Sequence, residues 1–321
     1  MPILFLHSGA PKTGTSYLQV LFSRYADQLS ESGILYPAGH MFEEARKGEI
    51  TSGNGVDLAN YLRPQLPHQI ADKDRLLEKL DATLTGARGK HVLLSSEFLF
   101  FPVGERSQSL ATLAANRGYE VRVVYLVRDI SAAAVSVYSQ AVKRVGITST
   151  FLEYLETWDP HYLAFLRTAE TAFGASALHV HNYEEHRGRL ADLMFRDILG
   201  TGFTPNEKPV VNRSLSPKEA EFQRLMNMAA PGNATIATFI SDALMKVNHE
   251  RAEFYPTHQE AELLRERFGK STIEVNKFVR GRPIDVVGTT VDNRDGDMPS
   301  DFERSIAAVL SHIVPRVIRG A

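Results

Sequence analysis

The chain has 321 residues, of which 43% are hydrophobic and 23% are charged, an ordinary composition for a globular protein with one large core. Its formal net charge of -2 gives no overall positive field to attract nucleic acid or an anionic membrane. The absence of cysteine excludes disulfides, thiolate metal sites and a cysteine nucleophile, and it suits a reducing compartment.

The hydropathy of the chain predicts a soluble protein. No apolar run approaches the roughly 18 to 20 residues that a membrane span needs. The first predicted strand begins at Ile3, which leaves no room for a signal peptide before it. A cytoplasmic location is therefore expected.

Four short apolar runs rich in β-branched residues predict buried strands, in chain order Ile3–His7, His91–Ser95, Val121–Val127 and Leu178–Asn182. Helical patterns lie between and after them, at Thr15–Leu29, Lys73–Leu84, Leu110–Arg117, Ile130–Arg144 and Tyr162–Phe173. Because the strand residues are continuously apolar rather than alternating, the sheet is expected to be parallel and covered on both faces. The expected fold class is α/β, a three-layer, P-loop-like parallel sheet flanked by helices.

The last third of the chain has a helical character. Ser216 followed by Pro217 is typical of a helix start, and helical patterns continue through Phe278 with no further predicted strand. The turn-rich stretch Gly281–Pro299 predicts an exposed loop, and a last helix is expected around Phe302–Ile313.

These patterns predict a single domain, 1–321, with an α/β nucleotide-binding core at 1–210 and a mainly helical part at 211–321. A polar, glycine-bearing stretch, Gly48–Asp57, interrupts the core and is interpreted as a mobile flap.

The first strand leads directly into the segment Ser8-Gly9-Ala10-Pro11-Lys12-Thr13-Gly14-Thr15-Ser16, and a helical pattern follows. Successive backbone N–H groups at such a turn, together with the unpaired N–H groups of a helix start, form an anion site. The segment therefore predicts a phosphate-binding loop. The structural alternative is a glycine turn capped by threonine and serine.

The position of the lysine separates this loop from the ATP- and GTP-binding P-loop, in which lysine follows the second glycine. Here Lys12 precedes Gly14, which moves its ammonium group toward the bond between the first phosphate and whatever is attached to it. The loop resembles the 5′-phosphosulfate loop of sulfotransferases that use 3′-phosphoadenosine 5′-phosphosulfate (PAPS), and is most similar to bacterial members. The resemblance implies cofactor binding by Pro11, Lys12, Thr13, Gly14, Thr15 and Ser16.

A second segment of the same resemblance begins where the third predicted strand ends. Arg128 follows that strand, and Ser136 lies eight residues later on the next predicted helix, at the offset of the family's 3′-phosphate site. A planar guanidinium and a hydroxyl can both donate to one phosphate dianion. The structural alternative pairs Arg128 with Asp129 and leaves Ser136 facing backbone.

The resemblance continues through the fourth strand and covers roughly Leu4 to Gly200. Tyr183, after that strand, resembles the family's tyrosine near the adenine, where an aromatic ring can stack on a purine. The Arg-Lys-Gly triplet that cytosolic sulfotransferases place on the 3′-phosphate is missing, and Arg280-Gly281-Arg282 is the only basic, glycine-containing candidate for it.

The resemblance implies transfer of a sulfuryl group from PAPS to an acceptor hydroxyl. By analogy with phosphoryl transfer, the protein then mainly positions groups and neutralises charge, and Lys12 is expected at the leaving oxygen. The acceptor hydroxyl needs a base. Glu97, after the second strand, is the first candidate, because polysaccharide and protein-tyrosine sulfotransferases use a glutamate, while His7 and then His40 are the next candidates.

The acceptor is expected to be a carbohydrate hydroxyl, with a small alcohol or phenol as the alternative. No His, Asp or Glu cluster has metal-ligand spacing, and the chemistry requires no metal. Two other classes of function stay open. One is a kinase that uses ATP and magnesium, with Asp129 as metal ligand, and the other is a non-catalytic binding protein on the same fold.

Overall fold

The computed structural model describes residues 1–39, 41–49, 51–62, 73–100, 105–207, 215–228, 231–246 and 253–292. The chain divides into two compact units, each described here by itself. Unit 1 consists of Met1–Asp129, Pro160–Val210 and Lys270–Ile284. Unit 2 consists of Ile130–Asp159, Val211–Gly269 and Asp285–Ala321.

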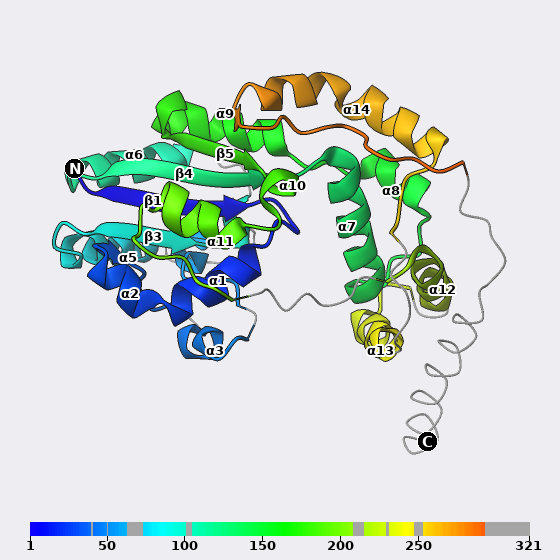
Figure 1. The fold of residues 1–321 in the computed structure, drawn as a ribbon, viewed down its shortest axis with the longest axis horizontal. Coiled ribbons are helices and arrows are strands. Elements are labelled where there is room, and N and C mark those ends of the chain that lie inside the picture. Colours follow the sequence, from blue (N-terminus) through cyan, green and yellow to red (C-terminus); the bar gives the residue numbers. More distant parts are fainter. Residues whose placement is uncertain are drawn as a thin grey trace, which may run out of the picture. The chain divides into compact units, whose positions relative to one another are not determined.

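Unit 1 is built around a parallel sheet (Figure 1). Six strands in the described part of the chain take the order β2-β3-β1-β4-β5-β6, and each neighbouring pair is parallel. Their bounds are β1 Ile3–Gly9, β2 Ile34–Leu35, β3 His91–Ser95, β4 Glu120–Val127, β5 Leu178–Asn182 and β6 Val279–Arg280. The predicted α/β fold class with a parallel sheet is confirmed.

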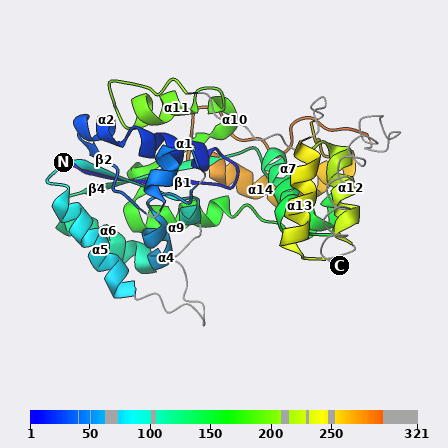
Figure 2. The ribbon, with the colours of Figure 1, turned by 90° about the horizontal axis from the view of Figure 1, so that it is seen from below.

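Helices cover both faces of this sheet, as Figure 2 shows for α1 and α11 on one face and α4, α6 and α9 on the other. The helices of unit 1 are α1 Thr15–Arg24, α2 Ala26–Glu31, α3 Phe42–Arg46, α4 Val56–Leu62, α5 Lys73–Gly86, α6 Glu105–Asn116, α9 Tyr162–Phe173, α10 Tyr183–His186 and α11 Leu190–Asp192. Three short helical segments are η1 Glu97–Phe100, η2 Ala175–Ala177 and η3 Leu193–Ile198.

The core on the α1 face is aromatic. Phe22 of α1 lies 5.5 Å, between ring centroids, from Phe195 of η3, and Phe5 of β1 is buried with them. Burying side chains of this size contributes about 1.5 to 3 kcal/mol each to folding. The α1 face therefore fixes the helix that follows the predicted phosphate loop.

Unit 2 contains α7 Ile130–Arg144, α8 Phe151–Thr157, α12 Pro217–Asn227 and α13 Ala234–Met245, and α14 His258–Asn276 begins in unit 2 and ends in unit 1. Buried amides join these helices, because Gln223 and Asn227 of α12 both donate to the carbonyl of Val142, at 3.3 and 3.0 Å. Ser216 caps α12 in a capping box with Glu219, which confirms the predicted helix start.

The helical prediction for the last third is wrong in one place. Val279 of β6 pairs with Val180 of β5, so a strand does follow Ser216. A two-residue strand has too few positions to show a period, and β2 escaped prediction for the same reason. The predicted exposed loop is exposed or half-buried over its described part except at Ile284, and it is anchored where the carbonyl of Asp285 accepts from the Ile130 N–H of α7 at 2.9 Å.

Other predictions are modified or lie elsewhere. The helix predicted at Thr15–Leu29 is interrupted at Tyr25, where φ is -101° and ψ is 20°, and continues as α2. The expected last helix and His40 lie outside the described residues. The single domain with a change of character at residue 210 stays a prediction, since residues 130–159 group with the later helices and residues 270–284 with the sheet.

Among the described helices, none is both long and apolar enough to cross a bilayer.

Candidate functional site

The loop between β1 and α1 has the backbone of an anion site. Lys12 and Gly14 both adopt the left-handed region, at φ 67° and 79°, which turns the chain sharply between strand and helix. The Ala10 N–H donates to the carbonyl of Leu126 at 3.0 Å, and the Thr13 hydroxyl donates to the carbonyl of Ala10 at 2.6 Å. These bonds tie the loop to the neighbouring strand and to itself.

The helix that follows is open at its start. α1 begins after Gly14, which has no side chain to cap the first turn. The N–H groups of Thr15, Ser16 and Tyr17 precede the first recorded helical bond, from the Leu18 N–H to the Gly14 carbonyl at 3.1 Å. Uncapped N–H groups at the positive end of a helix of this length favour an anion.

Two glycines make the loop possible. A Cβ at Gly9 would overlap the Thr15 hydroxyl and lie 2.7 Å from the Thr13 hydroxyl oxygen. A Cβ at Gly14 would lie 2.6 Å from Leu190 Cδ2 and 3.5 Å from Tyr183 Cε2, in a conformation that L side chains rarely adopt. The close packing at these two positions therefore requires glycine.

Lys12 and Glu97 lie close enough to interact. Glu97 is the first residue of η1, directly beyond the end of β3, and β3 is next to β1 in the sheet. Burial raises the pKa of the Glu97 carboxyl, while the positive charge of Lys12 acts in the opposite direction. Part of the Glu97 side chain is nevertheless exposed, so the carboxyl can be reached from solvent.

His7 has a different environment from Glu97. Its ring is completely buried, stacks edge-on against Phe22 and has Nδ1 at 2.8 Å from the Ser95 hydroxyl oxygen. Burial lowers the pKa of His7 to about 3, so the ring is neutral at physiological pH. A base must reach the proton that it removes. The geometry therefore favours Glu97 over His7.

Arg128 lies at the end of β4 and is held by the segment that follows β5. Its Nε donates to the Glu184 carboxylate at 2.5 Å, and its guanidinium carbon lies 5.4 Å from the centre of the Tyr183 ring. The side chains of Arg128 and Glu184 are 14% and 17% exposed, which makes this a largely buried ion pair. Tyr183 therefore contacts Arg128 and also lies beside Gly14 of the loop.

The carboxylate that binds Arg128 is Glu184, and not Asp129 as in the structural alternative from the sequence. Asp129 is paired with Arg282, at 3.1 Å between Nη2 and Oδ2, and accepts from Asn182 at 3.2 Å. Glu184 was missed as a site residue. Its signal was available in part, since it follows a predicted strand of the same parallel sheet, and parallel strands end at the same edge.

The triplet Arg280-Gly281-Arg282 begins with the last residue of β6, at the same edge of the sheet. The Arg282 N–H donates to the Glu185 carboxylate at 2.7 Å, and Gly281 adopts φ 86° with that carboxylate where a Cβ would be. Arg280 donates to the carbonyl of Leu178 at 3.0 Å. Arg282 is thus the member of the triplet that contacts Asp129, just after the end of β4.

Ser136 lies on α7, which belongs to unit 2, whereas Arg128 belongs to unit 1. The shared 3′-phosphate site predicted for these two residues therefore stays a prediction.

The stretch interpreted as a mobile flap is instead pinned over its described part. The Asn54 amide nitrogen donates to the carbonyls of Pro37 and Leu93, at 3.1 and 3.0 Å, and its oxygen accepts from the Ser95 N–H at 2.8 Å. Asn54 thereby binds the backbone at the end of β3 through its side-chain amide. Sequence reasoning missed it because isolated Asn and Gly residues indicate a loop but not its anchor.

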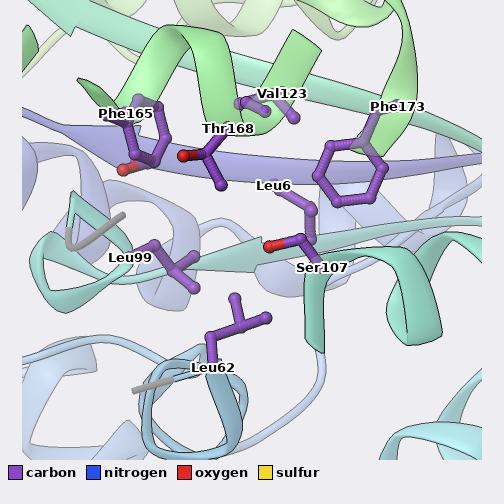
Figure 3. A pocket seen from close by; sticks show the side chains of 10 residues that line it. Leu6, Leu62, Leu99, Ser107, Val123, Phe165, Thr168 and Phe173 are labelled. Atoms are coloured by element: carbon purple, nitrogen blue, oxygen red, sulfur yellow. The ribbon is translucent and has the colours of Figure 1, made fainter. Parts of the chain in front are cut away.

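A small cavity of about 30 Å³ lies on the α6 and α9 face of the sheet (Figure 3). Its lining is mostly apolar and includes Leu6 of β1, Leu99 of η1 and Phe165 of α9. The Ser8 hydroxyl is buried in this lining, and the described residues offer it no hydrogen-bond partner. The cavity has room for water or a methyl-sized group. In the ranges that the structure describes, no three His, Asp or Glu side chains are grouped to hold a metal ion.

Comparison with known proteins gives no match to a family model and none to a curated protein. Among solved structures, the chain is similar to a sulfotransferase from Alicyclobacillus acidocaldarius, at 19% identity and a TM-score of 0.38, over 78% of this chain and 98% of that one. It is also similar to the sulfotransferase domain of the curacin biosynthetic pathway, at 12% identity and a TM-score of 0.37, over 84% and 98% of the two chains.

A third similar structure is retinol dehydratase in complex with androsterone and the inactive cofactor PAP, at 17% identity and a TM-score of 0.29, over 71% of this chain and 65% of that one. At such identities and TM-scores a likeness assigns no activity. Any activity of this chain must therefore be argued from its own residues.

Proposed function

We propose that the chain is a PAPS-dependent sulfotransferase, which moves the sulfuryl group of PAPS to an acceptor hydroxyl. The observation that carries this proposal is that Lys12, in the loop before the uncapped start of α1, lies near enough to Glu97 for its charge to act on that carboxyl. One cationic group and one carboxylate at that place are what a transfer from a phosphate to a hydroxyl requires. The absence of cysteine leaves no thiol to compete for the role of nucleophile.

The loop is suited to hold the 5′-phosphosulfate end of the nucleotide. The first-turn N–H groups of α1, which no N-cap side chain occupies, would donate to the phosphate oxygens. Lys12 would neutralise the oxygen that carries the developing charge. Groups of this kind act by being in place before the reaction, so they need no rearrangement during it.

Glu97 would serve as the base. The acceptor oxygen forms a new bond to sulfur, the bond from sulfur to the phosphate oxygen breaks, and the acceptor proton passes to the Glu97 carboxylate. The products are a sulfate ester and adenosine 3′,5′-bisphosphate. Burial raises the pKa of Glu97, which makes its carboxylate a stronger base than an ordinary glutamate.

Arg128 would recognise the ribose 3′-phosphate. Glu184 occupies Nε, so the two terminal nitrogens are the ones that would meet a phosphate, in the bidentate geometry that guanidinium favours. Arg282, which forms an ion pair with Asp129, the residue after Arg128, would add positive charge at the same edge. Tyr183, with its ring beside Gly14, would lie at the adenine, and Ser136 stays a predicted contact of the 3′-phosphate.

For the acceptor, the use of a glutamate as base supports a carbohydrate hydroxyl. A small alcohol or phenol is the second candidate. A panel of mono- and oligosaccharides, aliphatic alcohols and phenols, assayed with radiolabelled PAPS, separates the two.

A titration tests the nucleotide specificity. Tight binding of adenosine 3′,5′-bisphosphate without magnesium, measured by calorimetry, is the expected result. ATP is expected to bind more weakly, with or without magnesium, because it lacks the 3′-phosphate. Binding of ATP that requires magnesium and exceeds that of the bisphosphate would instead indicate the kinase alternative.

A further inference from the structure

The end of strand β3 is held by three different parts of unit 1. The Ser95 N–H donates to Asn54 Oδ1 at 2.8 Å, and the Ser95 carbonyl accepts from the Gly55 N–H at 2.9 Å. The Ser95 hydroxyl oxygen lies 2.8 Å from Nδ1 of His7. Every polar group of Ser95 is therefore engaged, and Ser95 itself is completely buried.

The two residues after Ser95 form the turn that carries Glu97. The Ser96 N–H donates to the carbonyl of His7 at 3.1 Å. The Ser96 hydroxyl accepts from the Phe98 N–H at 3.2 Å, and the Ser96 carbonyl accepts from the Leu99 N–H at 3.2 Å. The backbone is thus anchored on both sides of Glu97, while the Glu97 side chain itself remains at the surface.

The loop that carries Asn54 approaches Ser95 as closely as backbone permits. A Cβ at Gly53 would overlap the Ser95 carbonyl oxygen, and a Cβ at Gly55 would lie 3.1 Å from the same group. Contact with the end of β3 therefore requires glycine at position 53 and leaves little room for a side chain at position 55. The same loop also contacts β3 at Leu93, through the Asn54 amide.

Near this turn, buried polar atoms of Gln19 and His7 have no hydrogen-bond partner among the described residues, which lowers the stability of the fold. The Gln19 side chain is completely buried on α1, and neither of its amide atoms has a hydrogen-bond partner in the described structure. Gln19 Nε2 would lie 2.7 Å from a Cβ at Gly53, so the amide is beside the same contact. His7 Nε2 is also buried without a partner. Each unsatisfied buried group costs about 1 to 3 kcal/mol.

His7 connects this network to the phosphate loop. It lies on β1, the strand that runs directly into the loop, and its ring and carbonyl bind Ser95 and Ser96. A core built only for stability would have apolar side chains at these positions, since replacing both partners of a buried hydrogen bond by apolar groups is often nearly neutral. A rigid polar link between loop and turn has a different use, which is to fix two groups relative to one another.

We propose that His7 and Asn54 are positioning residues, which hold the turn bearing Glu97 at a fixed place relative to the phosphate loop bearing Lys12. This inference rests on the proposed sulfuryl transfer. It assigns His7 a role that requires no contact with the acceptor. The neutral state of the buried ring suits that role, since its bond to Ser95 is unaffected across the usual assay range.

The test compares His7→Leu, His7→Asn and Ser95→Ala. Leucine removes the ring nitrogens, whereas asparagine restores a polar atom near the position of Nδ1. Ser23→Ala is the matched control, because the Ser23 hydroxyl is equally buried on α1 and bonds to Tyr36 instead. The melting temperature, the Kd for adenosine 3′,5′-bisphosphate, and kcat are measured for each protein.

We expect His7→Leu and Ser95→Ala to lower kcat by roughly 10- to 100-fold, since a displacement of about 1 Å at a reacting group has effects of this size. Nucleotide affinity is expected to change by less than about twofold, because the loop contacts remain. His7→Asn should recover most of kcat. The control should lose melting temperature without losing kcat.

Equal losses of kcat in Ser95→Ala and the Ser23→Ala control, at equal losses of melting temperature, would overturn the inference. A fall in nucleotide affinity that accounts for the whole loss of activity would also overturn it.

A second readout does not depend on turnover. Carbon-13 NMR of labelled glutamate, assigned with Glu97→Gln, follows the titration of Glu97. The pKa of Glu97 should move toward the ordinary value in His7→Leu and Ser95→Ala but not in the control, and an unchanged titration contradicts the positioning role. If the variants show this response but the wild-type protein neither binds the bisphosphate nor turns over PAPS, the proposed function is refuted and the positioning role stands.

Discussion

Glu184 binds Arg128 through Nε at 2.5 Å, so the arginine that we propose for the ribose 3′-phosphate already has a carboxylate partner. The pair is largely buried, and the exposed fractions of its side chains are 14% and 17%. The carboxylate orients the guanidinium plane, but its negative charge opposes the arrival of a phosphate dianion. These two effects can be separated by substitution.

Glu184→Gln is expected to tighten the binding of adenosine 3′,5′-bisphosphate by roughly two- to tenfold, because the amide oxygen still orients Nε while the repulsive charge is removed. The affinity for 5′-AMP, which lacks the 3′-phosphate, should not change. Arg128→Ala should weaken only the bisphosphate. Calorimetry with the two nucleotides measures both effects, and an equal gain for both nucleotides would place Arg128 away from the 3′-phosphate.

Lys12→Ala is expected to lower kcat by about 10² to 10³-fold, the usual effect of removing one preorganised group at a developing charge. Lys90→Ala is the control, since Lys90 is exposed and donates to Ser30 instead. Single-turnover assays with PAPS separate the chemical step from product release. A loss of similar size in both variants would argue against a role for Lys12 at the leaving oxygen.

Glu97→Gln is expected to keep nucleotide affinity and lose turnover. The base acts as the carboxylate, so wild-type activity should fall as the pH drops through the Glu97 pKa. Because burial raises that pKa, the decline should begin at a higher pH than for an ordinary glutamate. A profile of kcat against pH tests this, and a fully active Glu97→Gln variant would move the base to His7 or His40.

Burial of neutral His7 predicts a pH dependence of stability. Its pKa is about 3 in the folded protein and about 6.5 when unfolded, so below pH 6.5 the unfolded state binds more protons. The stabilisation is complete above pH 6.5 and is lost progressively as the pH falls toward 3. Urea unfolding of wild type and His7→Asn between pH 7 and 4 should show a shallower slope for the variant by up to about 1.4 kcal/mol per pH unit. Parallel slopes would contradict the lowered pKa.

Gly9→Ala should abolish nucleotide binding, because its methyl group would overlap the Thr15 hydroxyl and displace the loop. Gly86→Ala is the matched control, since a Cβ there would meet nothing within 4 Å and Gly86 ends helix α5. The control is expected to bind normally and to be as stable as wild type or slightly more so. Normal binding by Gly9→Ala would show that the loop tolerates the methyl group and does not contact the phosphate closely.

The sequence predicted those parts of the site that are continuous in the chain. The apolar run, the loop from Gly9 to Ser16 and the helix start are neighbours, so their order alone indicated a strand, an anion loop and a helix. Four of the described strands and the bounds of α7 and α9 were predicted for the same reason. Long apolar runs and helical periods are local patterns.

What depended on distant segments needed the tertiary structure. Glu184 reaches Arg128 because they follow β5 and β4, which lie side by side in the sheet. Asn54 reaches Ser95 because the segment before α4 packs against the end of β3. The residues next to His7 in the sequence do not show whether its side chain faces solvent or the core. Its burial is decided by Phe22 of the packed helix and by Ser95 of the neighbouring strand.

The chain by itself therefore determined which chemical groups stand at the end of the first strand, since covalent order fixes the loop and its lysine. Folding decided which carboxylate lies near that lysine, which one neutralises the arginine, and which histidine is kept from water. Those outcomes follow from strand order and side-chain packing, which bring together residues that no local pattern links.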